Sequence, residues 1–194
     1  MQLLDLDLNK FYTYADYLKW QFEQRVELIK GKIFEMSAPN RLHQKFSIKL
    51  ATKLDTFLED KTCNVYTAPF DVRFPGNSKR TDEIDTILQP DICVICDISK
   101  LDNEGCNGAP DIVIEILSPG NKARELRNKY DIYEESGVIE YWIVSPQDET
   151  VLIYTLYEGK YQASRIMTYG DIVTSSVLPG FSLNLTELFE SVKR

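Results

Sequence analysis

The chain has 194 residues, of which 43% are hydrophobic and 27% charged, and its formal net charge is −8. This length and composition indicate an ordinary globular protein, and we interpret residues 1–194 as one domain that includes an N-terminal helix and hairpin within residues 1–36. No apolar run is long enough to span a bilayer, which argues against a membrane protein. The acidic balance disfavours non-specific adhesion to nucleic acid, because phosphate contacts require surplus Lys and Arg, but it does not exclude a local basic site.

The N-terminus and the cysteines predict a cytoplasmic protein. Acidic side chains interrupt the first seven residues, which is unlike a secretory signal peptide. Cysteines stay reduced in the cytoplasm, so free thiols are expected at Cys63, Cys93, Cys96 and Cys106. The Cys93-x-x-Cys96 spacing does not favour zinc, because these two side chains point to opposite faces of a strand and no second cysteine pair follows.

In chain order, the first periodic segments predict a helix, a hairpin and a second helix. Thr13 begins the first helix, and residues 26–36 form a hairpin that turns at Lys30 and Gly31. A long amphipathic helix is expected over residues 41–59, because apolar side chains recur there at intervals of three and four.

The rest of the chain predicts an α+β (α/β-like) fold, in which a mixed central sheet is flanked by helices. We expect the strand–helix–strand segment within residues 112–144 to be a right-handed crossover between parallel strands. The segments are short strands at 64–66 and 70–74, a strand at 87–95, a loop at 97–110, a strand at 112–117, a helix capped at 118–121 and ending near 135, a strand at 138–144, a hairpin of 151–157 with 161–167, and a helix at 185–192.

The strand at residues 112–117 is the part of the sequence that most strongly suggests a functional site. It is dense in β-branched residues, and alternation places Asp111, Val113, Glu115 and Leu117 on one face. An ionised carboxylate inside a core is costly unless a cation pairs with it. Glu115 therefore predicts a nearby metal ion or ammonium group.

A second acidic residue could join this site. Two predicted strands open with Pro-Asp, at Asp91 and at Asp111. If the strands are neighbours, Asp91 and Glu115 would meet and offer Mg²⁺ the one or two carboxylates that it usually takes from a protein. The alternative is that Asp after Pro is a turn residue, and we favour that interpretation for Asp111.

Lys129 could supply an ammonium group. It lies three residues after Leu126 and four before Tyr133, so it leans toward the sheet from the edge of a buried stripe that also contains Tyr130. The alternative is a lysine whose stem packs while its charged head stays in water. His43, on an apolar helix face, is most simply a core histidine with a satisfied hydrogen bond, and Glu27 a surface carboxylate of the hairpin.

Taken together, these residues resemble the PD-(D/E)XK nuclease superfamily, and most closely its bacterial Uma family of restriction-endonuclease-like proteins. The resemblance spans most of the chain and is more specific in the second half. The matching residues are Glu27-Leu-Ile-Lys-Gly-Lys-Ile, His43, Pro90-Asp91-Ile, Pro110-Asp-Ile-Val-Ile-Glu-Ile-Leu-Ser-Pro119, Lys129, Tyr130, Tyr133 and Gly137-Val-Ile-Glu-Tyr-Trp-Ile-Val-Ser-Pro146.

The resemblance implies Mg²⁺- or Mn²⁺-dependent hydrolysis of phosphodiester bonds in nucleic acid, with DNA as the expected substrate. Asp91 and Glu115 would bind the metal. The superfamily's lysine normally stands two residues after the acid, where this chain has Leu117, so the resemblance assigns the ammonium to Lys129 instead. We expect Lys129→Met to abolish hydrolysis with the fold intact, and Leu117→Ala only to loosen packing.

The resemblance also gives three residues accessory roles: His43, where a first-helix polar residue often joins the site, Glu27 and Asp111. Nucleic acid should approach the densest basic clusters, which are Lys122, Arg124, Arg127 and Lys79-Arg80. A homodimer is left open.

Two other classes of function remain. Leu117 and the acidic balance fit a catalytically lapsed nuclease fold that binds a partner protein. A carboxylate-pair glycosidase would need neither Lys129 nor a metal ion.

Overall fold

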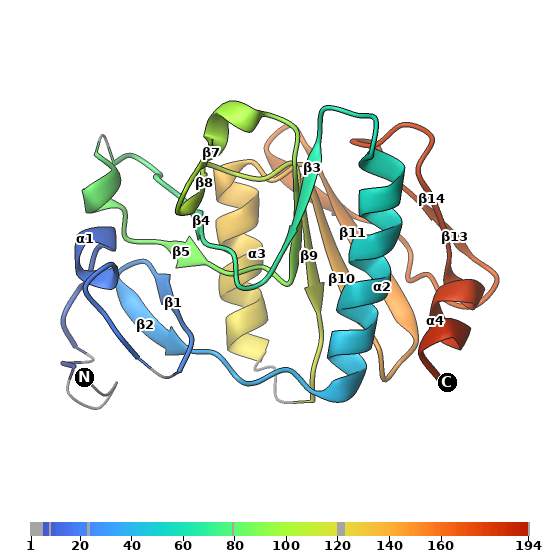
Figure 1. Cartoon of the computed structure of the whole chain (residues 1–194), viewed down its shortest axis with the longest axis horizontal. Helices are drawn as coiled ribbons and strands as arrows, with labels where there is room; N and C mark the ends of the chain where they lie inside the picture. Colours follow the sequence, from blue (N-terminus) through green and yellow to red (C-terminus); the bar gives the residue numbers. More distant parts are fainter. Residues whose placement is uncertain (1–5, 8, 23, 79, 120–122, 194) are drawn as a thin grey trace.

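The computed structural model describes residues 6, 7, 9–22, 24–78, 80–119 and 123–193. Within these residues the chain forms two six-stranded sheets, a two-stranded sheet and the helices that pack on them (Figure 1). The predicted α+β class, with a mixed sheet flanked by helices, is confirmed. No helix in the described part of the chain is long and apolar enough to cross a membrane.

One six-stranded sheet, called here the central sheet, contains the predicted crossover. Strands β9 and β10 pair in parallel, with α3 between them in the sequence, and the other neighbouring strands pair antiparallel. In spatial order the strands are β12 (Lys160–Ala163), β11 (Thr150–Tyr157), β10 (Glu140–Ser145), β9 (Ile112–Ile116), β6 (Ile92–Ile95) and β3 (Asn64–Thr67).

The two faces of the central sheet are covered by different helices, and Figure 1 shows β9 running between α2 (Arg41–Leu58) and α3 (Ala123–Ser136). Ile112, Ile114 and Ile116 belong to the apolar core on the side of α2 and α4 (Leu185–Lys193). Val113 packs with Ile132 and Tyr133 of α3. The alternation predicted for this strand is therefore correct, and it places Glu115 on the α3 side.

The other six-stranded sheet, called here the N-terminal sheet, lies beside the central one, at the left of Figure 1. The hairpin turn at Lys30 and Gly31 is confirmed, and both residues have positive φ angles, 46° and 74°. In spatial order the strands are β2 (Lys32–Glu35), β1 (Val26–Ile29), β5 (Ile87–Leu88), β4 (Val72–Arg73), β8 (Gly105–Asn107) and β7 (Leu101–Asp102).

The segment from 87 to 95, predicted as one strand, is two strands in two different sheets. β5 ends at Leu88 and β6 begins at Ile92, with Gln89 and Pro90 between them. Proline has no N–H to donate to a ladder, which explains why pairing stops there. The chain passes from the N-terminal sheet to the central sheet at this point.

The remaining differences are smaller. The predicted loop at 97–110 contains a 3₁₀ helix (Ile98–Lys100) and strands β7 and β8, and the predicted strand at 70–74 shortens to β4. The cap at 118–121 falls partly outside the described residues. Helix α1 (Tyr14–Tyr17) follows Thr13 as predicted, a further 3₁₀ turn spans Thr81–Glu83, and the two-stranded sheet of β13 (Ile172–Thr174) and β14 (Ser182–Asn184) had no prediction.

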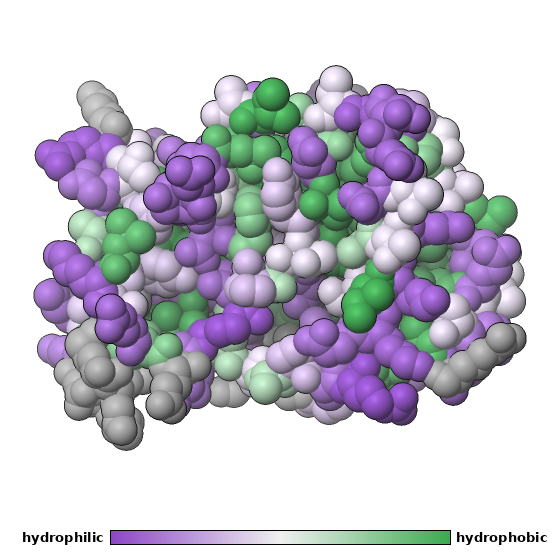
Figure 2. Space-filling model, viewed as in Figure 1, coloured by the Kyte–Doolittle hydropathy of each residue, from purple (hydrophilic) through white to green (hydrophobic). Residues whose placement is uncertain are grey.

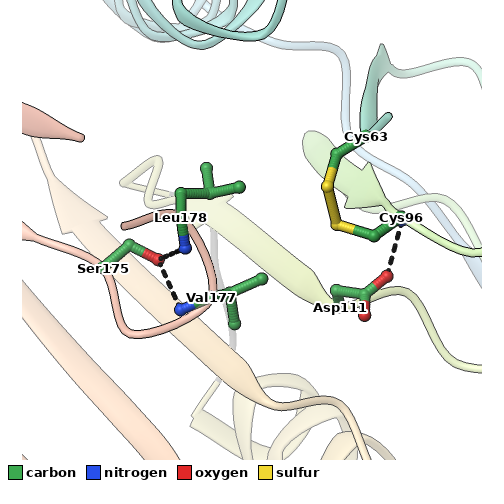
Figure 3. Close-up of a disulfide and its surroundings, with 6 residues drawn as sticks. All are labelled: Cys63, Cys96, Asp111, Ser175, Val177 and Leu178. Carbon is green, nitrogen blue, oxygen red and sulfur yellow. Dashed lines mark hydrogen bonds between the residues drawn. A yellow bond between two sulfur atoms is a disulfide. The ribbon is translucent and has the colours of Figure 1, made fainter. Parts of the chain in front are cut away.

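The prediction of four free thiols is wrong for two of them. Cys63 and Cys96 form a disulfide, and Asp111 accepts a hydrogen bond from the backbone of Cys96 beside it (Figure 3). Cys93 and Cys106 are free and buried.

Candidate active site

A pocket of about 660 Å³ opens where β9 ends and where α2 and α3 begin. These ends of the three elements lie in the lower half of Figure 1. Hydrophilic side chains predominate on the face seen in Figure 2, where the apolar ones form separate patches. The pocket is lined by Arg25, residues 36–40, one side of α2 from His43 to Thr52, Thr67, Ala68, Asp91, Glu115, Ile116, Ser118, Pro119, Glu125 and Lys129.

Neighbouring strands bring Asp91 and Glu115 together at this pocket. The β6–β9 register pairs Ile92 with Ile114, so one step further along the strands Asp91 stands opposite Glu115. The Asp91 carboxylate also accepts a hydrogen bond, through Oδ2, from the backbone N of Ile116 at 2.7 Å. Directly opposed residues have Cα atoms about 5 Å apart, so both carboxylates can reach the same small volume.

Lys129 reaches Glu115, as predicted. Its Nζ lies 3.0 Å from Glu115 Oε1 and 3.0 Å from Glu27 Oε1, and the residue is only 4% exposed. The alternative of a lysine with a solvated head is therefore wrong. Lys129 is more buried than Leu126 and Tyr130, the half-buried residues of the predicted stripe.

Glu27 is a buried partner of this lysine, so its interpretation as a surface carboxylate is wrong. It is 0% exposed, and its Oε1 accepts a hydrogen bond from the backbone N of Gln89 at 2.9 Å. Every residue of β1 is buried, so the strand lacks the alternation that would have marked Glu27 as inward-facing. Among the described residues, the second oxygen, Oε2, is buried and has no hydrogen-bond partner.

His43 lies in the first turn of α2, where it contacts Asp91. The helix is capped by Asn40, whose side chain accepts a hydrogen bond from the backbone N of His43. His43 Nε2 lies 3.0 Å from Asp91 Oδ2, while its Nδ1 is buried without a partner in the described part of the chain. A neutral His43 protonated at Nε2 would donate to the carboxylate and fix its orientation.

Asp111 does not join this group. It lies at the start of β9, four residues before Glu115, and a strand rise of 3.3 Å per residue puts these positions about 13 Å apart. Its Oδ2 accepts from the backbone N of Cys96 at 2.7 Å, a residue 15 positions earlier, so it links the start of β9 to the residue after β6 and does not make the local turn bond favoured for it above.

Tyr133 belongs to the site, although the sequence pattern predicts only a core residue at this position. Its hydroxyl donates to Glu115 Oε1 at 2.7 Å. Tyr133 follows Lys129 by four residues, so both side chains leave the same face of α3 and reach one carboxylate. The spacing was visible in the sequence, but Tyr133 was interpreted only as a core residue.

Burial and charge act together on the protonation of the site. Burial raises the pKa of Glu115 to about 7; the Lys129 ammonium opposes the rise, and the negative charges of Asp91 and Glu27 add to it. Burial also opposes the charge on Lys129, but the carboxylates of Glu115 and Glu27 outweigh it and hold its pKa well above the ordinary value. The lysine therefore stays charged, and Glu115 changes protonation near neutral pH.

The predicted basic clusters can be described only in part. Lys79, Lys122 and the side chain of Arg124 lie outside the described residues, and Arg127 is exposed on α3. Arg80 pairs with Asp82 at 2.6 Å and with Glu83 at 3.8 Å, so nearby acids offset its charge. The approach of nucleic acid to this side remains a prediction.

Comparisons with known proteins agree with the fold. The model of the family Uma2, described as "Putative restriction endonuclease", matches residues 14–186. A crystal structure described as "a putative nuclease belonging to DUF820", from Anabaena variabilis, superposes with a TM-score of 0.74 at 21% identity, over 93% of this chain and 98% of that one.

A curated relative, the uncharacterized protein slr1290 of Synechocystis sp., is 24% identical over 142 residues, which are 72% of this chain and 71% of the relative. The solved structure supports the nuclease-like fold, and the family model covers most of the chain. The chain therefore belongs to the Uma2 family, described as "Putative restriction endonuclease".

Proposed function

We propose that this protein is a Mg²⁺- or Mn²⁺-dependent endonuclease that hydrolyses phosphodiester bonds in DNA. The observation that carries the proposal is the position of Asp91 and Glu115, side by side at the ends of neighbouring strands, next to a buried ammonium group and open to a pocket. Family membership supports nuclease chemistry in general, and this geometry suggests where it takes place.

The donor set fits a hard divalent cation. Among the described residues, no group of three or more His, Cys, Asp or Glu side chains is arranged to hold a metal ion, so a cage made of protein alone is not the model for this site. Mg²⁺ commonly takes one or two carboxylates and completes its shell with water and substrate phosphate. Asp91 and Glu115 would hold it. Their hydrogen bonds within the protein involve Oδ2 of Asp91 and Oε1 of Glu115, so the other oxygen of each carboxylate would face the cation.

A bound cation would supply a polarised phosphoryl oxygen and a more acidic water. Lys129 would orient the attacking water and offset charge that develops on the phosphoryl group. Glu27 also binds the ammonium, so Lys129 would keep a carboxylate partner if Glu115 bound a cation. His43 would hold Asp91 in one orientation.

The surrounding backbone favours an anionic substrate despite the acidic composition. Both α2 and α3 begin at the pocket, and helix N-termini carry partial positive charge from unpaired N–H groups. These fixed dipoles attract phosphate without adding to the net charge of −8.

Isothermal titration with Mg²⁺ and Mn²⁺ tests the metal site, and cleavage of supercoiled plasmid tests the activity. We expect Glu115→Gln to abolish both metal binding and cleavage. Glu187→Gln, which removes the same charge from an exposed position on α4, should change neither. If the wild-type protein binds no divalent cation and leaves plasmid intact, the nuclease proposal fails and a lapsed nuclease fold that binds a partner protein takes its place.

A further inference from the structure

The pocket contains a second cationic side chain, Arg25, which the proposed chemistry does not use. Arg25 and Lys129 are the cationic side chains, lysine or arginine, that line the pocket within the described residues. Arg25 directly precedes β1, and its backbone oxygen accepts a hydrogen bond from Met36 N at 2.9 Å. The backbone of Arg25 is thus fixed beside the loop that leads into α2.

The Arg25 guanidinium is held by a neutral group. Its Nε and Nη2 donate to the side-chain oxygen of Gln89 at 2.9 and 2.6 Å. These bonds orient the guanidinium without cancelling its charge, and they use only part of its five N–H groups. By contrast, Arg73, Arg80 and Arg165 each bind a carboxylate, those of Asp102, Asp82 and Asp171.

Gln89 is itself fixed, so it acts as a rigid support for Arg25. Its backbone N donates to Glu27, and its side-chain Nε2 donates to Asp71 at 2.8 Å and to the Tyr17 hydroxyl at 3.2 Å. These donor contacts turn the amide oxygen toward Arg25. One residue therefore holds both Glu27, the partner of Lys129, and Arg25.

We infer that Arg25 binds a backbone phosphate of the nucleic acid next to the phosphate that is cleaved. The inference rests on the proposed function. Arg25 precedes Glu27 by two residues, so in extended chain they lie about 7 Å apart and their side chains leave on the same side. Glu27 shares the Lys129 ammonium with Glu115, so Arg25 stands two residues along the chain from a member of that cluster. A planar guanidinium in an open pocket, with further N–H groups that have no partner among the described residues, is well suited to phosphate oxygens.

Binding of a fluorescein-labelled DNA duplex, measured by anisotropy in EDTA, tests the inference without metal or cleavage. We expect Arg25→Gln to weaken binding about tenfold and to lower the slope of log K against log salt by about one, because one phosphate contact is lost. Arg25→Lys should keep the slope and bind with intermediate affinity, because it keeps the charge and loses the fork. Arg165→Gln removes an equal charge outside the pocket lining and should bind like wild type.

Three results would overturn the inference: wild-type affinity and salt slope in Arg25→Gln, an equal loss in Arg165→Gln, or no duplex binding by the wild-type protein.

The test separates this inference from the proposed function. Glu115→Gln should bind the metal-free duplex at least as tightly as wild type, because it removes a carboxylate that repels phosphate. In the cleavage assay, Arg25→Gln should raise KM and leave kcat within a few-fold. Duplex binding that depends on Arg25 in a protein that never cleaves would support Arg25 as a phosphate contact and refute the nuclease proposal.

Discussion

Replacing Lys129 by methionine should destabilise the protein in a way that depends on pH. The ammonium lies 3.0 Å from each of two carboxylates, those of Glu27 and Glu115, and all three side chains are at most 8% exposed. Removing one member of a buried ion pair typically costs about 3–5 kcal/mol, because it leaves a buried charge uncompensated. For a chain of this size that corresponds to a fall in Tm of roughly 6–20 °C. The fold should survive, since domains are typically stable by about 5–15 kcal/mol.

The pH dependence follows from Glu115. Burial already raises its pKa, and the Lys129 ammonium is what opposes the rise, so the pKa should increase further in Lys129→Met. A carboxyl whose folded pKa exceeds its unfolded value makes the folded state bind the additional proton. Stability of the variant should therefore fall as pH rises from about 4.5 through 7 and above, and the difference from wild type should be larger at pH 8 than at pH 5.5.

Chemical denaturation at these two pH values measures the effect. Lys53→Met, at an exposed position of α2, serves as the matched control and should change the free energy of unfolding by less than about 0.5 kcal/mol. Adding Glu27→Gln to Lys129→Met should recover part of the loss, because one of the two uncompensated charges is gone. A variant within about 1 kcal/mol of wild type at pH 8, or a penalty that is the same at both pH values, would refute this account of the ion pair.

Three further predictions concern the site and the disulfide. Mg²⁺ affinity, measured by titration calorimetry, should fall about tenfold per pH unit below pH 7, because protons then compete for Glu115, whose pKa is about 7; a flat profile from pH 5 to 8 would exclude Glu115 as a ligand. In plasmid cleavage, Lys129→Met should abolish turnover while Leu117→Ala keeps it and only lowers Tm; the reverse order would remove the lysine from the mechanism. Reducing the Cys63–Cys96 disulfide, with a sequence separation of 33, should lower the free energy of unfolding by about 3–4 kcal/mol, and an unchanged denaturation midpoint in reductant would argue against the bond.

The contact between Glu115 and Lys129 could be predicted because both signals are local. A carboxylate inside a β-branched run requires a cation, and the helix that follows the strand must pack back on it in a crossover. Helical spacing then directs Lys129 toward the sheet. Each step uses only neighbours in sequence, and the structure confirms the resulting contact.

Glu27 and the disulfide depend instead on how distant segments pair. The burial of Glu27 arises where the N-terminal sheet meets α3, and neither its own strand nor its neighbours in sequence carry that information. Cys63 and Cys96 meet because β3 pairs with β6 through Asn64 and Ile95, one step inside the two cysteines. A cytoplasmic location predicts free thiols. The register of β3 and β6 instead places these two cysteines next to each other, and that register could not be derived from the sequence.

The break at Pro90 was a missed local signal. Proline within a strand pattern marks an edge or an interruption, yet the segment was interpreted as continuous because apolar residues stand on both sides. A continuous strand does not predict that β5 and β6 belong to different sheets, nor that Gln89 lies between them. Hence the supports of Arg25 and Glu27 could be recognised only in the structure.

The change of sheet at Gln89 and Pro90 has a consequence for the order of folding. Lys129 meets Glu27 across 102 positions of sequence and joins α3 to the N-terminal sheet, so this contact cannot form until α3 and that sheet have docked. Gln89 meets Glu27 across 62 positions, but within the N-terminal sheet itself, where β1 pairs with β5. Contacts between such distant positions form slowly, because the chain loses loop entropy before they stabilise anything. A partly folded chain could thus bring Asp91 and Glu115 together on β6 and β9 while Lys129 still lacked Glu27. The buried ion pair of Lys129 and Glu27 would then form late in folding, after the strands that carry the two carboxylates have paired.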